Sequence, residues 1–188
     1  LDRYAEQLAA IPEIKSLGPL FKSSAEVELT DPGAEYVVTC VKHTFRNHMV
    51  LQYECTNTME DQLLENVYVE LESEDEDYEV LQTIPCPNLE YNKPGSVYVI
   101  VELPETVSSL CNSFTNTLKF IVKDASAGPS DPGLSDEYSV SRWFDVKMKT
   151  KKFHLAGELE TPSSHARLPT IAAVTATQDT GGKQKQPP

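Results

Sequence analysis

The sequence predicts an all-β protein, an antiparallel β-sandwich of seven or eight strands followed by a disordered C-terminal tail. Residues 35–58 are rich in β-branched and aromatic side chains and contain neither Pro nor Gly. Shorter alternating segments follow at regular spacing with turn residues between them, which is typical of a sandwich. From Thr161 onward, Thr, Ser, Ala, Gln, Gly and Pro dominate. That composition offers too little apolar area to offset an ordering cost of ~1–2 kcal/mol per residue.

The first elements lead into this β-rich stretch. Residues 1–20 predict a linker, because the helix-compatible piece 2–10 is followed by Pro12, Gly18 and Pro19. Strand signals begin at residues 26–29, and Asp31-Pro32-Gly33 supplies a turn.

Residues 35–58 predict a β-hairpin with its turn at residues 46–48. A two-residue loop would pair Lys42 with Leu51 and turn Val41 and Phe45 away from the core, whereas a three-residue loop keeps them on the apolar face. The sequence therefore favours the three-residue loop. The predicted pairs are Phe45 with Met49, His43 with Leu51, and Val41 with Tyr53. The predicted buried set is Val41, Phe45, Met49, Leu51, Tyr53 and Cys55.

Later strands are predicted from alternating apolar positions, and residues 125–136 predict a surface loop. The predicted strands lie near residues 67–71, 78–84, 97–103, 118–122 and 137–140, the last of which could continue to residue 148. Three regions follow from this pattern. They are a linker over residues 1–20, a sandwich over 21–148 and a disordered tail over 149–188.

Charge and apolar patterning exclude several classes of function. The 188 residues carry a net charge of −13, which argues against a nucleic-acid partner. Residues 1–140 hold 8 basic and 25 acidic groups, whereas residues 141–188 hold 8 and 4, so the balance changes sign in the tail. The apolar runs are far shorter than the ~20 residues that span a bilayer, and the first residues lack the layout of a signal peptide. The sequence therefore predicts neither a membrane-spanning segment nor a signal peptide.

The four cysteines, Cys40, Cys55, Cys86 and Cys111, have neither CxxC spacing nor the density of a disulfide scaffold. No Asn-x-Ser/Thr sequon occurs in the chain. These features predict a reducing, cytosolic environment in which the thiols act as small buried apolar groups.

The candidate catalytic and metal-binding residues do not form a site at the level of sequence. His43 and His48 flank the predicted turn, but the carboxylates of Glu35 and Glu54 lie away from it, so His43 is interpreted as a partly buried strand residue. No GxSxG motif occurs, and no enzyme, metal or cofactor is predicted. The sequence does not decide whether Trp143 anchors the last strand or is exposed.

Residues 60–79 form an acidic cluster with ten carboxylates and no Lys or Arg. Because it also lacks Gly, it does not fit a calcium loop. A solvated surface is the default interpretation, and a docking face for a basic partner is the alternative.

Several segments together resemble one family, the appendage (ear) domain of the coatomer gamma subunit in the COPI vesicle coat. The segments are LGPLFKSS at 17–24, VELT at 27–30, KHTFRNHMVLQYECTNT at 42–58, DQLLENV at 61–67, YNKPGSVYV at 91–99 and DEYSV at 136–140. The resemblance implies an immunoglobulin-like β-sandwich in a cytoplasmic coat that is peripheral on Golgi membranes and COPI vesicles. It also implies a non-enzymatic interaction module for Golgi-to-endoplasmic-reticulum and intra-Golgi transport. The implied partners are other coatomer subunits and accessory proteins such as ARF regulators.

The resemblance ends near residue 141. The family's second, platform subdomain is therefore predicted to be absent, none of its binding residues can be assigned, and the partner-binding residues are unknown. We interpret the residues from about 141 as an alternative or out-of-frame terminus. From sandwich physics alone, an extracellular immunoglobulin-like adhesion domain is the alternative function.

Overall fold

The computed structural model describes residues 2–73, 78–104 and 113–145, and within them it contains two helices and ten strands. The helices are α1 (Asp2–Ala9) and α2 (Pro12–Lys15). The strands are β1 (Lys22–Ser23), β2 (Val27–Glu28), β3 (Tyr36–Thr44), β4 (His48–Asn57), β5 (Gln62–Ser73), β6 (Glu79–Ile84), β7 (Cys86–Leu89), β8 (Pro94–Glu102), β9 (Ser113–Asp124) and β10 (Leu134–Asp145).

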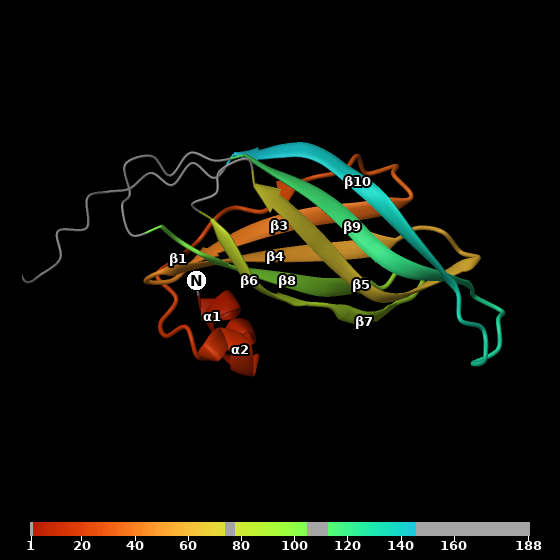
Figure 1. Cartoon of the computed structure of the whole chain (residues 1–188), viewed down its shortest axis with the longest axis horizontal. Coiled ribbons are helices and arrows are strands. Elements are labelled where there is room, and N and C mark those ends of the chain that lie inside the picture. The colour runs from red at the N-terminus through yellow and green to blue at the C-terminus, as the bar shows by residue number, and fades with distance from the viewer. Residues whose placement is uncertain (1, 74–77, 105–112, 146–188) are drawn as a thin grey trace, which may run out of the picture. The chain divides into compact units, whose positions relative to one another are not determined.

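The strands form two antiparallel sheets packed face to face (Figure 1). Sheet A has the order β1-β3-β4-β8-β6, with β2 also paired to β3, and sheet B has the order β10-β9-β5-β7. The predicted all-β antiparallel sandwich is therefore confirmed. The predicted disordered tail, residues 149–188, lies outside the described residues.

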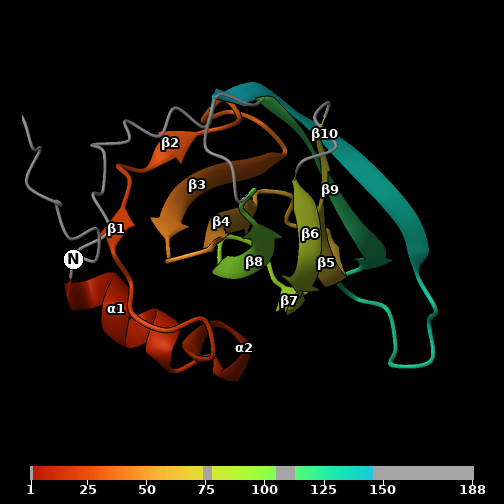
Figure 2. The same ribbon diagram turned by 60° about the vertical axis from the view of Figure 1, so that its left-hand side comes forward.

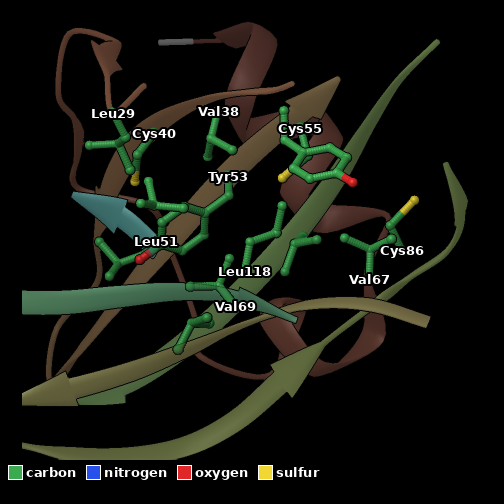
Figure 3. Close-up of a cluster of buried hydrophobic side chains, with 14 of the residues drawn as sticks. Leu29, Val38, Cys40, Leu51, Tyr53, Cys55, Val67, Val69, Cys86 and Leu118 are labelled. Atoms are coloured by element: carbon green, nitrogen blue, oxygen red, sulfur yellow. The ribbon is translucent and has the colours of Figure 1, made fainter. Parts of the chain in front are cut away.

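The main core lies between the two sheets. Alternate residues of β4, including Leu51, Tyr53 and Cys55, point toward Val69 of β5 and Leu118 of β9 (Figure 3). All five side chains are almost completely buried. The alternation that the sequence shows on β4 thus correctly identifies the face of the strand that packs against the second sheet.

The register of the β3–β4 hairpin differs from the predicted one. Cys40 lies opposite Tyr53 and Lys42 opposite Leu51, and the backbone N–H of Phe45 donates to the carbonyl of His48 at 2.9 Å. The predicted three-residue loop is therefore wrong, and the chain makes the two-residue loop. The predicted pairs of Phe45 with Met49, His43 with Leu51 and Val41 with Tyr53 do not form.

The prediction of register failed because both faces of sheet A are buried. Phe45 packs in a second apolar cluster with Leu8 of α1 and Ile14 of α2, on the side of the sheet away from sheet B. Figure 2 shows the helices on one side of β4 and β8, and β9 and β10 on the other. All six residues of the predicted buried set are buried, but Val41 and Phe45 face the helix side and the other four face the main core.

The segment predicted to be a linker contains the two helices. In α1, Leu8 is 2% exposed, and Ile14 of α2 is 1% exposed. Tyr4 and Leu8 are four residues apart on α1 and so share a face, and Tyr4 and Ile11 pack against the second cluster, to which Leu8 belongs. This segment is thus a packed layer on sheet A, while the division of the chain into linker, sandwich and tail remains a prediction.

Two further strands differ from their predicted limits. Residues 86–89 form β7 although Pro85 and Pro87 predict the end of a strand there; β7 is an edge strand, and edge strands tolerate Pro. Strand β10 begins inside the predicted loop at Leu134. Positions 146 and 148 of its predicted extension lie outside the described residues. Neither of the helices in the described part of the chain has the length and apolar character that crossing a membrane requires.

Candidate binding surfaces

His43 is a buried member of the scaffold. Its Nδ1 lies 2.8 Å from Ser23 Oγ, and its Nε2 lies 3.0 Å from Gln52 Oε1. Because a carbonyl oxygen can only accept, Nε2 carries the proton and Nδ1 accepts from the hydroxyl of Ser23. The ring of Tyr4 lies 5.0 Å from the imidazole, centroid to centroid. These contacts tie β1, β3, β4 and α1 together.

His43 and His48 are not joined into a metal site. His43 is more buried than the sequence predicts, since none of its surface is exposed, whereas His48 at the start of β4 is half-buried. Among residues 2–73, 78–104 and 113–145, no three His, Cys, Asp or Glu side chains are grouped closely enough to hold a metal ion.

Burial lowers the pKa of His43 below its ordinary value, and the hydrogen bond with Gln52 opposes this only in part. Unfolding restores a pKa of about 6.5. The unfolded chain therefore binds more protons than the folded one once the pH falls below about 6.5, so acidification destabilises the fold.

We expect the free energy of unfolding to fall between pH 6.5 and pH 5 by more in the wild type than in His43→Gln. The difference in slope is at most one proton, about 1.4 kcal/mol per pH unit. Urea unfolding followed by circular dichroism at several pH values measures it, and His48→Gln, at the half-buried histidine of the same hairpin, is the matched control. Equal slopes for all three proteins would contradict this assignment.

A concave pocket of about 330 Å³ opens where α1 meets the outer face of sheet A. The helix forms one wall, and β3, β4 and the residue before β2 form the rest. The lining residues are Arg3, Tyr4, Gln7, Glu26, Thr39, Val41, Gln52 and Glu54. We call this the α1 pocket.

On the helix wall of the α1 pocket, the side chains of Arg3 and Gln7 form contacts with tyrosine side chains of the chain itself. The guanidinium of Arg3 lies 4.9 Å from the ring centroid of Tyr4 and donates to the hydroxyl of Tyr4 at 3.0 Å. Gln7 Nε2 donates to the hydroxyl of Tyr98 at 3.2 Å. In the described residues neither Glu26 nor Glu54 forms an ion pair, and both are exposed. The sheet side therefore presents free carboxylates.

A second surface lies at the β6 edge of sheet A, where β6 is the last strand in the order. Val80 and Leu81 are 41% and 44% exposed, and the register against β8 shifts between Val80 and Gln82. The bulge leaves Leu81 without a partner residue in the β8 register. We call Val80 and Leu81 the β6 edge.

The predicted acidic cluster is only partly described. Glu65 and Glu70 of β5 form ion pairs with Lys123 at 2.8 Å and Lys119 at 2.6 Å, both on β9. These carboxylates therefore belong to a charged surface on sheet B, and residues 74–77 lie outside the described chain. The prediction that the whole cluster is a solvated surface stays a prediction. For Trp143, the backbone is part of β10 and the side chain lies outside the description.

The three described cysteines, Cys40, Cys55 and Cys86, are buried free thiols. Burial raises the pKa of all three, that of Cys55 to about 12, so they are protonated at neutral pH. This confirms, for these three, the prediction of thiols that act as small apolar groups. Cys111 lies outside the described residues.

The α1 pocket was missed by sequence reasoning. The alternation in β4 already places Gln52 and Glu54 on the face away from the main core. Nothing in the sequence of that strand indicates that a helix packs beside these two residues. The signal was the four-residue spacing of Tyr4 and Leu8, which gives α1 a face that packs against sheet A.

Comparison with known proteins points to one family. A family model described as the coatomer gamma subunit appendage platform subdomain matches residues 2–144. Coatomer subunit gamma-2 of Danio rerio is 51% identical over 141 residues, which are 73% of this chain and 16% of that protein. Coatomer subunit gamma-1 of Homo sapiens is 51% identical over 140 residues, 72% of this chain and 16% of that protein. The chain thus spans about 16% of the length of these relatives.

Among solved structures, the crystal structure of the yeast GGA1_GAE domain-P21 aligns with a TM-score of 0.44 and 11% sequence identity. The alignment covers 65% of this chain and 99% of that chain.

The match to the family model corrects one prediction. The platform subdomain was predicted to be absent, yet the model that carries this description runs without interruption from α1 into β10. The helices and both sheets therefore lie within the residues that match the platform-subdomain model. The prediction that this subdomain is absent is wrong by that definition of the platform subdomain.

Proposed function

Because this chain belongs to the coatomer gamma subunit appendage family, we propose that it is a non-enzymatic interaction module of the COPI coat. It acts in Golgi-to-endoplasmic-reticulum and intra-Golgi vesicle transport, in the cytoplasm and on Golgi membranes that it reaches through the coat. Its partners are other coatomer subunits and coat accessory proteins such as ARF regulators. The comparisons give no support to the alternative of an extracellular adhesion domain.

The observation that carries this proposal is the β6 edge. An edge strand presents backbone donors and acceptors that can pair with an added strand, and exposed side chains beside them give selectivity. Val80 and Leu81 supply exposed apolar groups on a strand of this kind. A partner segment in extended conformation can therefore pair with β6 and bury these two side chains.

We expect Leu81→Lys to weaken retention of an ARF regulator about ten-fold, equivalent to ~1.4 kcal/mol. The physical reason is that a lysine at this position must be desolvated when a partner covers the edge. The measurement is a pull-down from cytosol with the immobilised chain, quantified with antibodies to the ARF regulator and to another coatomer subunit.

The matched control is Leu134→Lys, which makes the same change at an apolar residue that is 75% exposed on β10 of sheet B. Circular dichroism establishes that both variants keep the fold. Equal retention by the wild type and Leu81→Lys, or equal loss in both variants, would count against the β6 edge. Failure of all three proteins to retain either prey would count against the interaction module itself.

A further inference from the structure

We infer that the partner segment that pairs with β6 carries a basic residue next to an apolar one, with the basic side chain beside Glu79 and the apolar side chain beside Val80. This inference rests on the proposed function of the β6 edge and adds the chemistry of the partner. The partner is an extended segment of another protein in which Lys or Arg adjoins an aliphatic or aromatic residue.

Strand β6 has one open side in the part of the chain that the structure describes. It follows β8 at the end of sheet A, and its residues pair with those of β8. An edge strand of this kind offers N–H and C=O groups to an added strand. Side chains of the added strand then lie beside those of β6 and on the same faces, so each position of the partner has a defined neighbour.

Glu79 lies at the open end of a row of side chains that crosses sheet A. It pairs with Glu102 of β8, which in turn pairs with His48 of β4, and directly paired residues share a face. Both glutamates are exposed, and within residues 2–73, 78–104 and 113–145 neither forms an ion pair. Like charges that lie directly opposite each other destabilise a sheet. A cation at the next position of the row, on an added strand, therefore meets an unpaired carboxylate.

Val80 presents an apolar position on the opposite face of the sheet. It pairs with Val101, a completely buried residue of the main core, and successive residues of a strand point to opposite faces. Val80 itself is 41% exposed. An apolar residue beside it removes that surface from water. Because Glu79 and Val80 are consecutive, their neighbours on the partner are consecutive as well.

A second copy of this chain fits the open side of β6 less well than a basic segment does. Each copy carries a net charge of −13, so two copies repel each other. The β6 strand of a second copy also contains the bulge between Val80 and Gln82, and a bulge disrupts the regular ladder of a strand pair. Charge complementarity therefore favours a basic segment of another protein.

The test is a titration of the ¹⁵N-labelled full chain with three short peptides, followed by two-dimensional NMR. The lysine peptide is acetyl-Thr-Lys-Val-Lys-Val-Thr-amide, and the glutamine and glutamate peptides carry Gln or Glu in place of both lysines. In an extended peptide these residues lie on one face and the valines on the other. We expect the backbone amide cross-peaks of Glu79 and Val80 to shift in a saturable manner. The lysine peptide is expected to bind about three-fold more tightly than the glutamine peptide, and the glutamate peptide most weakly.

A matched pair of charge reversals tests the role of Glu79. Glu79→Lys is expected to abolish the three-fold advantage of the lysine peptide over the glutamine peptide. Glu28→Lys makes the same change of net charge at an exposed residue of β2 and is expected to keep that advantage. The amide spectra report at the same time that each variant is folded.

Three results would overturn the inference. They are equal binding of the lysine and glutamine peptides by the wild type, an equal loss of the preference in both variants, and shifts of the β6 amides that depend on the concentration of the chain without any peptide. The last result would place a second copy on β6. Absence of a saturable shift at Glu79 and Val80 would contradict strand pairing at β6 altogether. Failure to retain the ARF regulator and the coatomer subunit, with the lysine preference intact, would count against the function in the coat alone.

Discussion

Replacing Leu51 by Ala is expected to lower the free energy of unfolding by about 2–5 kcal/mol. Leu51 lies in the middle of β4, none of its surface is exposed, and it belongs to the main core between the two sheets (Figure 3). Truncation removes buried methyl groups and leaves a cavity that the surrounding strands can fill only in part. Because small domains are stable by roughly 5–15 kcal/mol, this one change could remove much of the total.

Chemical denaturation monitored by circular dichroism measures this loss. Leu134→Ala is the control, because Leu134 is 75% exposed and its truncation is expected to change stability by about 0.5 kcal/mol or less. A loss below about 1 kcal/mol for Leu51→Ala would mean that β4 is not central to the core.

Replacing Asn116 by Ala is expected to cost about 1–3 kcal/mol through a different mechanism. The hydroxyl of Tyr53 donates to Asn116 Oδ1 at 2.6 Å, and both side chains are buried between the sheets. Removing the amide leaves a phenol hydroxyl in the core without its acceptor. Burial raises the pKa of Tyr53, so ionisation of the phenol does not relieve the loss at neutral pH.

A double-mutant cycle separates this hydrogen bond from simple loss of volume. Tyr53→Phe in the Asn116→Ala background removes the stranded hydroxyl and is expected to recover part of the stability, with a coupling energy of about 0.5–3 kcal/mol. Urea unfolding of the four proteins supplies the numbers. Strictly additive losses would show that the bond contributes nothing of its own.

The fold class was predictable because strand alternation is a local property. In β4 the residues at 49, 51, 53 and 55 repeat with the period of a strand, and that period identifies the face that packs against sheet B. Asp31-Pro32-Gly33 correctly placed the turn before β3, which is closed by a hydrogen bond from the Ala34 N–H to the carbonyl of Asp31. Strand β7 was missed because it contains Pro87, and Pro is compatible with a strand only at the edge of a sheet. Whether a segment forms an edge strand depends on the arrangement of the whole sheet and cannot be read from the segment's own sequence.

The hairpin register could not be predicted because it depends on a distant segment. With one buried face, Val41 and Phe45 have to join Met49 and Leu51; with α1 and α2 on the other face, they are buried without doing so. The α1 pocket was hidden for the same reason. Gln52 and Glu54 are a polar strand face in the sequence and become part of a pocket only when α1 lies beside them.

The packing of sheet A on both sides has a consequence for how the chain selects one structure. Near the turn, Met49, Val50 and Leu51 are apolar in succession and all are buried, so sliding β3 by one residue against β4 would still cover apolar groups on both faces. Hydrophobic burial alone therefore distinguishes the alternatives poorly. The hydrogen bond between His43 Nε2 and Gln52 Oε1 joins β3 to β4 in one alignment, so this buried polar pair specifies a single register of the hairpin.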